Sequence, residues 1–273
     1  MKVDISIVII NYNTFSLTCN CIESIIRNER QTSYEIIIVD NHSIERDSSD
    51  FLTIFPQVKL ISCKENVGFA KGSNLGIEKA EGDFILLLNS DTLLLNDAIA
   101  CSLKYLQLNN NVAVATCRLE YENGQVQHNC QRFPSIRYLL FELLRLQKIF
   151  SSKKHTLFGA FFDYNTVAHP DWVWGTFFMF RKELIGKLPG KKLADDFFMY
   201  GEDMQWCMEF KHLGYEIAFL PDARVVHLMG ASGGKKNVMM NQNLDVFMHC
   251  YYPGWKRFLI RMINILLTGK YAH

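Results

Sequence analysis

The chain has 273 residues, of which 49% are hydrophobic and 21% are charged. This balance is that of a folded protein with one large domain or two small ones, and it excludes a disordered or collagen-like chain. The 29 basic and 28 acidic residues give a formal net charge of +1. No overall positive field therefore favours nucleic acid as a partner.

Eight cysteines are scattered along the chain without a CxxC pair, which argues against a zinc ribbon or a thioredoxin-type site. Near the N-terminus, Asp4 precedes a short apolar run, Ile5 to Ile10, that Ser6 interrupts, and this pattern does not resemble a signal peptide. No window reaches the roughly 18 to 20 uninterrupted apolar residues of a membrane-spanning helix. We expect reduced thiols, a cytoplasmic location and no transmembrane segment.

The first 108 residues alternate between strand patterns and helical patterns. Apolar runs predict strands, and helical spacing predicts helices, in this order: strand 3–10, helix 17–27, strands 35–39 and 58–62, helix 68–80, strand 83–88 and helix 95–108. Such alternation predicts an α/β fold with a mostly parallel sheet covered by helices on both faces. Ligands bind such sheets at the carboxyl ends of the strands.

From Val112 onward the alternation becomes irregular. The pattern predicts a strand at 113–117, a polar turn at 122–124 and a leucine-rich helix at 136–150. No linker rich in Pro, Gly or Ser separates the two halves. We therefore expect residues 1–230 to form one domain, followed by a distinct basic tail at 231–273.

Three predicted strands end in polar segments, at residues 11–13, 40–43 and 89–91, that would meet at one edge of the sheet. Asp40 presents a carboxylate to a ribose hydroxyl or a base N–H, although an Asx turn explains the residue more simply. Asp91 suits a hard divalent cation, which requires anionic oxygen held rigidly. The alternative for Asp91 is a helix N-cap.

A glycine-rich helix start at residues 66–76 places Lys71 where it could meet a phosphate. The segment matches neither GxGxxG nor the P-loop. Glycines that allow close packing of helix on strand explain it equally well.

Glu202 and Asp203 follow the aromatic run 197–200. Partial burial among aromatic rings raises the pKa of a carboxyl group toward the range of a general base. Two acids at a helix start also favour the helix dipole, and both interpretations can hold together.

Two further segments carry candidate site residues. His227 follows the apolar stretch 223–226 and becomes a metal ligand only if Asp91 lies close, in which case the imidazole shifts the preference from Mg²⁺ toward Mn²⁺. Trp172, Trp174 and Gly175 suggest a wall for sugar stacking or, equally, an aromatic part of the core.

Seven segments, taken together and in this order, resemble the family 2 inverting glycosyltransferases of the GT-A fold, with most similarity to the rhamnosyltransferase-like branch. They are residues 6–13, 38–43, 66–76, 88–91, 174–179, 198–203 and 227–232. The resemblance implies a Rossmann-like, mostly parallel central sheet flanked by helices, with a C-terminal helical tail. It also implies a nucleotide-sugar donor half at about 1–115 and an acceptor and catalytic half at 116–230.

The resemblance further implies a role for each matching position. The residues that would contact the nucleotide sugar are Asn11, Asn13, Asp40, Asn41, Lys71, Asn74 and Asn89. Asp91 and His227 would bind a divalent metal, Mn²⁺ or Mg²⁺, although Asn89 replaces the first acid of the family's DxD-like motif. Asp203 would be the catalytic base with Glu202 as its neighbour. Trp174 and Gly175 would contact the acceptor.

The expected reaction moves a sugar from a nucleoside diphosphate sugar to a hydroxyl of a glycan or lipid-linked acceptor, with inversion, in cell-surface polysaccharide synthesis. Two alternatives stay open. One is a catalytically silent sugar-nucleotide-binding subunit of a polysaccharide assembly complex, and the other is a nucleotidyltransferase.

The tail has a charge and spacing pattern of its own. Between Lys235 and Lys270 it carries six Lys or Arg and one acid, Asp245. An apolar stripe at helical spacing consists of Trp255, Phe258, Leu259, Met262, Ile263 and Leu266. This pattern predicts an interfacial helix on the anionic inner face of the plasma membrane, with the 136–150 helix as a second membrane-facing element. A helix packed on the domain by the same stripe is an equal alternative.

Overall fold

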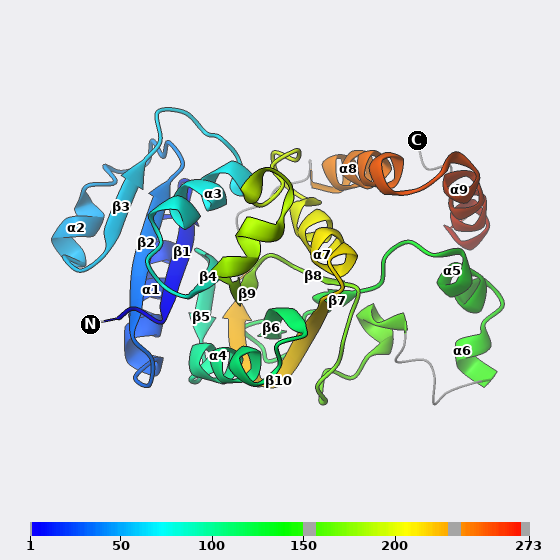
Figure 1. Cartoon of the computed structure of the whole chain (residues 1–273), viewed down its shortest axis with the longest axis horizontal. Helices are drawn as coiled ribbons and strands as arrows, with labels where there is room; N and C mark the ends of the chain where they lie inside the picture. Colours follow the sequence, from blue (N-terminus) through cyan, green and yellow to red (C-terminus); the bar gives the residue numbers. More distant parts are fainter. Residues whose placement is uncertain (1, 150–156, 229–235, 269–273) are drawn as a thin grey trace.

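The computed structural model describes residues 2–149, 157–228 and 236–268 (Figure 1). The strands are β1 (Ile5–Asn11), β2 (Tyr34–Asp40), β3 (Lys59–Ser62), β4 (Phe84–Asn89), β5 (Thr92–Leu94), β6 (Val112–Glu120), β7 (Cys130–Gln131), β8 (Trp172–Val173), β9 (Phe177–Arg181) and β10 (Glu216–His227). The helices are α1 (Phe15–Asn28), α2 (Asp50–Ile54), α3 (Phe69–Lys79), α4 (Ala98–Leu108), α5 (Ile136–Leu143), α6 (Leu146–Ile149), α7 (Glu202–His212), α8 (Lys236–Tyr251) and α9 (Gly254–Thr268).

A large mixed sheet forms the centre of the fold, in the order β3-β2-β1-β4-β9-β6-β10-β5. Parallel pairs join β1 to β2 and β4, β2 to β3, and β6 to β10. β9 lies between β4 and β6 and runs antiparallel to both, and β5 runs antiparallel to β10. The predicted α/β fold with a mostly parallel sheet is confirmed, with β9 and β5 as additional antiparallel strands.

Both faces of the sheet are covered, which is why its central strands are almost continuously apolar. On one face, Ile7 of β1 joins a core cluster with residues of α1 and α4. On the other face, Val8 joins a cluster with residues of α3 and α7. Alternate residues of β1 point to opposite faces of the sheet, so one strand contributes to both cores.

Glycines in α3 let this helix lie close to the sheet. A Cβ atom on Gly76 would lie 2.3 Å from a methyl carbon of Val8. The packing explanation for this part of the glycine-rich segment is therefore confirmed. Gly68 differs, because it precedes the helix with a φ of 83°.

Two predicted helices differ from the structure. The helix expected at 95–108 begins at Ala98, because residues 92–94 form β5 and pair with β10. Asp91 therefore precedes a strand, and its interpretation as a helix N-cap is wrong. The helix expected at 136–150 is interrupted after Leu143, where Arg145 adopts a φ of 52°; residue 150 lies outside the described residues.

The tail forms two helices rather than one. α8 packs on α7, where Phe247 and Met248 share a core cluster with Met204 and Met208. α9 lies beside α5 at one end of the molecule (Figure 1). Within the described ranges, no helix is both long enough and apolar enough to cross a bilayer. Residues 229–235 and 269–273, which include the end of the 227–232 motif, lie outside the described residues.

Candidate active site

The carboxyl ends of β1 and β2 are joined by their polar side chains. Asn11 and Asp40 are paired in register, and the Asn11 amide donates to Asp40 Oδ1 at 2.7 Å and to Ser43 Oγ at 2.9 Å. The Thr14 hydroxyl donates to Asn11 Oδ1 at 3.1 Å and lies 3.0 Å from the hydroxyl of Ser90, beyond β4. The predicted meeting of these strand ends is confirmed.

Asp40 and Asn41 shape this edge from beneath its surface. Asp40 is only 4% exposed, and its Oδ2 accepts the backbone N–H of Ser43 at 3.2 Å, so a local turn is part of its role. The Asn41 amide donates to Asn66 Oδ1 at 2.8 Å, and its oxygen accepts the N–H of Val67 at 2.9 Å. Asn41 therefore holds the loop that leads into α3.

The other residues predicted to contact the nucleotide sugar differ in their surroundings. Asn13 has a φ of 52°, and its Oδ1 accepts the N–H of Ile44 at 2.9 Å. Lys71 is exposed in the first turn of α3 and makes no ion pair within the described ranges. Asn74 is buried and exchanges two hydrogen bonds, of 2.8 and 3.1 Å, with the backbone of Leu193.

Asn74 also borders a cavity of about 890 Å³ near Phe84, where β4 begins. That end of the sheet is opposite to the strand ends that bind ligands in open α/β folds. The structure therefore does not bring Asn74 into the strand-end cluster.

Asp91 and His227 meet beside this cluster. His227 ends β10 and is paired with Thr92, the first residue of β5, so its ring comes close to the turn that holds Asp91. Its Nε2 lies 3.4 Å from Asp91 Oδ1. Its Nδ1 lies 2.8 Å from Oε1 of the buried Gln127. His227 was a candidate metal ligand only if Asp91 lay close to it, and the structure meets this condition.

The pair fits a divalent cation as part of a larger ligand set. Two ligands that each lie about 2.1 Å from one ion are at most about 4.2 Å apart, and the separation of 3.4 Å satisfies this limit. A carboxylate with an imidazole suits Mn²⁺ or a similar ion. Among the described residues, no three His, Cys, Asp or Glu side chains are arranged to hold a metal. The remaining ligands would be diphosphate oxygens and water.

β9 brings the candidate base to the same edge. The Asn89 N–H donates to the Thr176 carbonyl at 3.0 Å, and its amide lies 3.4 Å from the Thr176 hydroxyl. The N–H of the preceding residue, Gly175, donates to Asp203 Oδ2 at 3.1 Å. Gly175 therefore contacts the candidate base directly, while Trp174 is partly buried against the core. Asp203 lies beside the end of β4 although it is 112 residues beyond Asp91.

Glu202 and Asp203 lie in the first turn of α7, so the helix-start interpretation is confirmed. Burial raises the pKa of Asp203, and the N–H groups of Met204 and Gly175 offset only part of this increase. Burial and then the charge of Asp203 raise the pKa of Glu202. Glu202 is 6% exposed, and its Oε2 has no hydrogen-bond partner among the described residues. The pair therefore favours one negative charge rather than two near neutral pH.

The loop before Asp203 is joined to the start of α3. The Phe69 N–H donates to the Phe198 carbonyl oxygen at 2.9 Å. A Cβ atom on Gly68 would lie only 2.4 Å from that oxygen. Only a residue without a side chain fits here, which gives Gly68 a role that the glycine-rich pattern did not specify.

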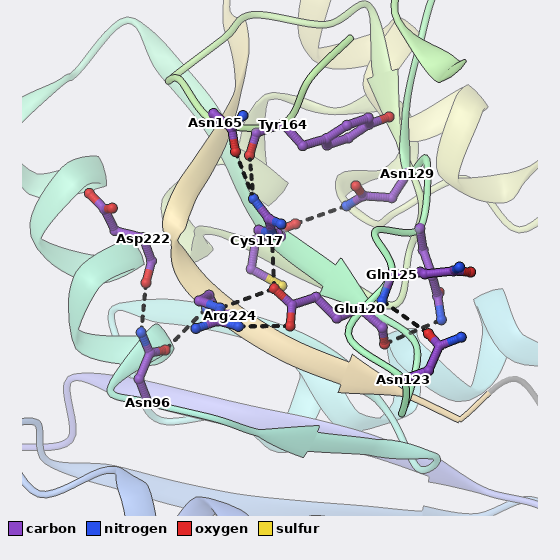
Figure 2. A network of polar contacts seen from close by, with 12 residues as sticks. Asn96, Cys117, Glu120, Asn123, Gln125, Asn129, Tyr164, Asn165, Asp222 and Arg224 are labelled. Carbon is purple, nitrogen blue, oxygen red and sulfur yellow. Dashed lines mark hydrogen bonds and ion pairs between the residues drawn. The ribbon is translucent and has the colours of Figure 1, made fainter. Parts of the chain in front are cut away.

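A second polar network supports the strand ends near His227. At the end of β6, the buried Glu120 carboxylate accepts hydrogen bonds from Arg224, at 3.0 and 2.9 Å, and from Arg118 at 2.9 Å (Figure 2). The contacts with Arg224 are the main reason that the pKa of Glu120 is lowered. Glu120 is paired with Val226, so the network fixes β6 against β10 one residue before His227.

Sequence reasoning missed several residues of this edge: Thr14, Ser43, Gln127 and Thr176. Ser43 and Thr176 lie within the motifs already singled out, and that position was the available signal. Gln127 lies in a loop without a recognisable pattern, 100 residues from its partner His227.

The curated relatives of this sequence are described as glycosyltransferases. An uncharacterised glycosyltransferase of Rickettsia bellii is 33% identical over 108 residues, which are 39% of this chain and 15% of that protein. Glycosyltransferase GlyG of Streptococcus pneumoniae is 24% identical over 224 residues, 80% of this chain and 68% of that protein. The chain spans less than a fifth of the length of the Rickettsia relatives.

Solved structures show the same fold at low sequence identity. GalNAc-T7 with UDP, GalNAc and Mn²⁺ matches with a TM-score of 0.71 and 13% identity, over 99% of this chain and 52% of that one. The mannosyltransferase PcManGT from Pyrobaculum calidifontis, in complex with GDP-Man and Mn²⁺, matches with a TM-score of 0.62 and 16% identity. The match covers 98% of this chain and 71% of that one. These likenesses show that the fold is GT-A-like.

The sequence profile described as "Glycosyl transferase family 2" matches residues 6–188, about two thirds of the chain. This match includes the ends of β1, β2 and β4 and the turn at Gly175. The chain belongs to glycosyl transferase family 2.

Proposed function

We propose that the protein transfers a sugar from a nucleoside diphosphate sugar to an acceptor hydroxyl, with inversion at the anomeric carbon. The observation that carries this proposal is a half-buried carboxylate with a raised pKa, Asp203, held beside the strand end that leads to Asp91 and His227. Family membership supports sugar transfer over the nucleotidyltransferase alternative.

The donor would bind at the strand ends of the N-terminal half, about residues 1–115. The polar side chains there are the partly exposed Asn13 and Asn89, with Asn11, Asp40 and Asn41 buried beneath them. Lys71 is exposed in the first turn of α3, makes no ion pair with another described residue, and would meet the diphosphate. We leave Asn74 out of this set because Leu193 already uses both ends of its amide.

The proposed reaction is a single in-line displacement. A bond forms between the acceptor oxygen and the anomeric carbon while the bond from that carbon to the diphosphate oxygen breaks. The acceptor hydroxyl gives its proton to Asp203, whose carboxylate is oriented by Gly175 and Met204. Glu202 stays protonated while Asp203 is ionised, so the site keeps one basic carboxylate.

Asp91 and His227 would hold the divalent cation, Mn²⁺ or Mg²⁺. When bound, such an ion neutralises negative charge on a departing diphosphate. The Mn²⁺ in the structures of GalNAc-T7 and PcManGT supports this part of the proposal. Asn89 adds no charge, so Asp91 would be the anionic ligand from the protein.

The acceptor side, residues 116–230, would include Trp174 beside the base. A glycan or lipid-linked acceptor, polysaccharide synthesis and a rhamnosyl donor stay predictions from the sequence resemblance.

We further propose peripheral contact with an anionic membrane through α9. Ile263 is the one buried residue of its apolar stripe, whereas Trp255, Phe258 and Leu266 are 65%, 63% and 65% exposed.

The experiment that tests the activity is a panel of nucleotide sugars, each with Mn²⁺ and with Mg²⁺, followed by thermal unfolding and by product analysis. A donor that binds the folded state raises Tm by mass action. We expect one nucleotide sugar both to raise Tm and to be converted to nucleoside diphosphate. Stabilisation without conversion would indicate a silent subunit, and conversion only when pyrophosphate is added, with a nucleoside triphosphate and a sugar 1-phosphate as products, would indicate a nucleotidyltransferase.

A further inference from the structure

Gln127 makes two hydrogen-bonding contacts with a single residue, His227. The Gln127 Nε2 donates to the His227 carbonyl oxygen at 2.7 Å, and its Oε1 lies 2.8 Å from His227 Nδ1. The Gln127 side chain is buried, with 1% of the residue exposed. These two contacts are sufficient to decide which ring nitrogen of His227 carries hydrogen.

The orientation of the amide follows from what each atom can donate or accept. The His227 carbonyl only accepts, so the amide group facing it must be the donor, Nε2. The amide oxygen then faces Nδ1, and an amide oxygen only accepts. Nδ1 must therefore carry the hydrogen, which leaves the lone pair of the neutral ring on Nε2.

Nε2 faces a second acceptor. Its distance to Asp91 Oδ1 is 3.4 Å, and the lone pair of a neutral ring cannot form a hydrogen bond with a carboxylate. A divalent metal between the two atoms would accept the lone pair of Nε2 and attract the carboxylate while the ring stays neutral. A histidine that binds a metal through one ring nitrogen usually donates its other N–H to a fixed acceptor.

We propose that Gln127 is a positioning residue that fixes His227 in the Nδ1–H tautomer and directs Nε2 at Asp91, so that the pair is preformed for one divalent cation. This inference rests on the proposed function only in identifying that cation with the metal of sugar transfer.

The support for Gln127 is rigid. Its N–H donates to the Leu119 carbonyl at 2.8 Å, and its carbonyl accepts the N–H of Asn129 at 2.9 Å. The hairpin that precedes it is closed by Tyr121, whose N–H donates to the Gln125 carbonyl at 2.8 Å. The Glu120 network described above holds the base of the same hairpin (Figure 2). Gln127 is therefore held by backbone on both sides, as a positioning role requires.

The first test uses the full chain with ¹⁵N-labelled histidine, at pH 8.5 and with Mg²⁺ as a diamagnetic ion. The His227 signals are assigned by their loss in His227→Gln. We expect the wild type to show the Nδ1–H tautomer. A wild-type Nε2–H tautomer would overturn the proposal without any need for a Gln127 variant to fold.

The second test compares Gln127→Leu, Gln127→Glu and the matched control Gln125→Leu, whose original side chain is exposed in the same hairpin. Mn²⁺ alone is the probe, followed by water-proton relaxation, with thermal unfolding as the check of folding. We expect Gln127→Leu to lose the Nδ1–H preference and to bind Mn²⁺ about 10 to 100-fold more weakly. Gln127→Glu still offers an acceptor to Nδ1–H and should retain the tautomer, and Gln125→Leu should match the wild type.

A folded Gln127→Leu with wild-type tautomer and Mn²⁺ affinity would overturn the proposal, as would loss of the tautomer in a folded Gln127→Glu. Both measurements are made without a nucleotide sugar. A chain that fails to transfer sugar can therefore still support the role of Gln127. Conversely, failure of this inference leaves the case for Asp203 as the base intact.

Discussion

The backbone N–H of Gly175 donates a hydrogen bond of 3.1 Å to Oδ2 of Asp203. Gly175 lies in the turn before β9, and Asp203 lies in the first turn of α7. The other carboxylate oxygen, Oδ1, accepts the N–H of Met204 at 2.8 Å. Backbone groups therefore orient the proposed base, and its remaining lone pairs are available to an acceptor hydroxyl.

Asp203→Asn should lower the kcat of sugar transfer by about 10² to 10⁴-fold, because an amide cannot accept the acceptor proton. The dissociation constant of the donor should stay unchanged, since the donor would bind at the ends of β1, β2 and β4. Steady-state kinetics and calorimetric donor titration measure the two quantities. Asp222→Asn, at an exposed carboxylate, is the matched control. Normal turnover in Asp203→Asn would remove Asp203 from the mechanism.

Glu202→Gln should make the protein more stable at pH 8 than the wild type. The pKa of Glu202 is raised in the folded state by burial and by Asp203, whereas in the unfolded chain it is about 4.3. At a pH between the unfolded and folded pKa values of Glu202, the folded state binds one more proton than the unfolded state. The free energy of unfolding therefore falls as pH rises, by at most about 1.4 kcal/mol per pH unit.

Glutamine has no proton to lose at this position, and the variant lacks that contribution. Urea unfolding at pH 5, 6.5 and 8 should show that the difference between Glu202→Gln and wild type grows with pH. Glu23→Gln, at an exposed residue of α1, should show no such trend. A parallel pH dependence in Glu202→Gln and wild type would contradict the raised pKa.

Gly68→Ala should destabilise the fold by about 1 to 3 kcal/mol, because alanine tolerates a φ of 83° poorly and its Cβ would lie 2.4 Å from the Phe198 oxygen. Displacement of this loop should also lower kcat through Asp203. Gly72→Ala is the control within α3. Its Cβ would lie 3.4 Å from the Ile10 side chain, an ordinary contact distance, and alanine is more favourable than glycine inside a helix by up to about 1 kcal/mol. Equal stability of the two variants would refute the proposed role of Gly68.

Removal of divalent metal should abolish transfer, and Asp91→Asn should weaken Mn²⁺ binding because it removes the charged ligand of the pair. Chelation followed by addition of Mn²⁺ or Mg²⁺ measures the first effect, and relaxation titration measures the second. Asp97→Asn, near the start of α4, is the matched control. Full activity in a chelated sample would show that the reaction needs no metal.

The double variant Trp255→Ser and Phe258→Ser should reduce binding to vesicles that contain anionic lipid, because both side chains are exposed on α9 beside a basic segment. Vesicle flotation of the full chain measures the effect, and neutral vesicles should bind less in every case. Leu108→Ser removes an apolar side chain that is 74% exposed on α4 and should change nothing. Equal flotation of the double variant and wild type would leave α9 without a membrane role.

Much of the N-terminal part of the sheet was predictable from local patterns. The apolar runs at 3–10, 35–39 and 83–88 specify buried strands wherever they occur, and parallel strands bring their carboxyl ends to one edge. Asn11 and Asp40 therefore meet at 2.7 Å although 29 residues separate them. The acids at 202 and 203 were likewise recognisable at a helix start.

The sequence by itself determined the α/β alternation and the chemistry of the strand ends, because strand and helix periods are encoded within each segment. Only the tertiary structure decided that β9 lies between β4 and β6, which carries Gly175 to Asp203. It also decided that β5 pairs with β10, which places His227 beside Asp91 and within reach of Gln127. These contacts depend on pairing between distant segments, and no local periodicity encodes which antiparallel neighbour a strand will find.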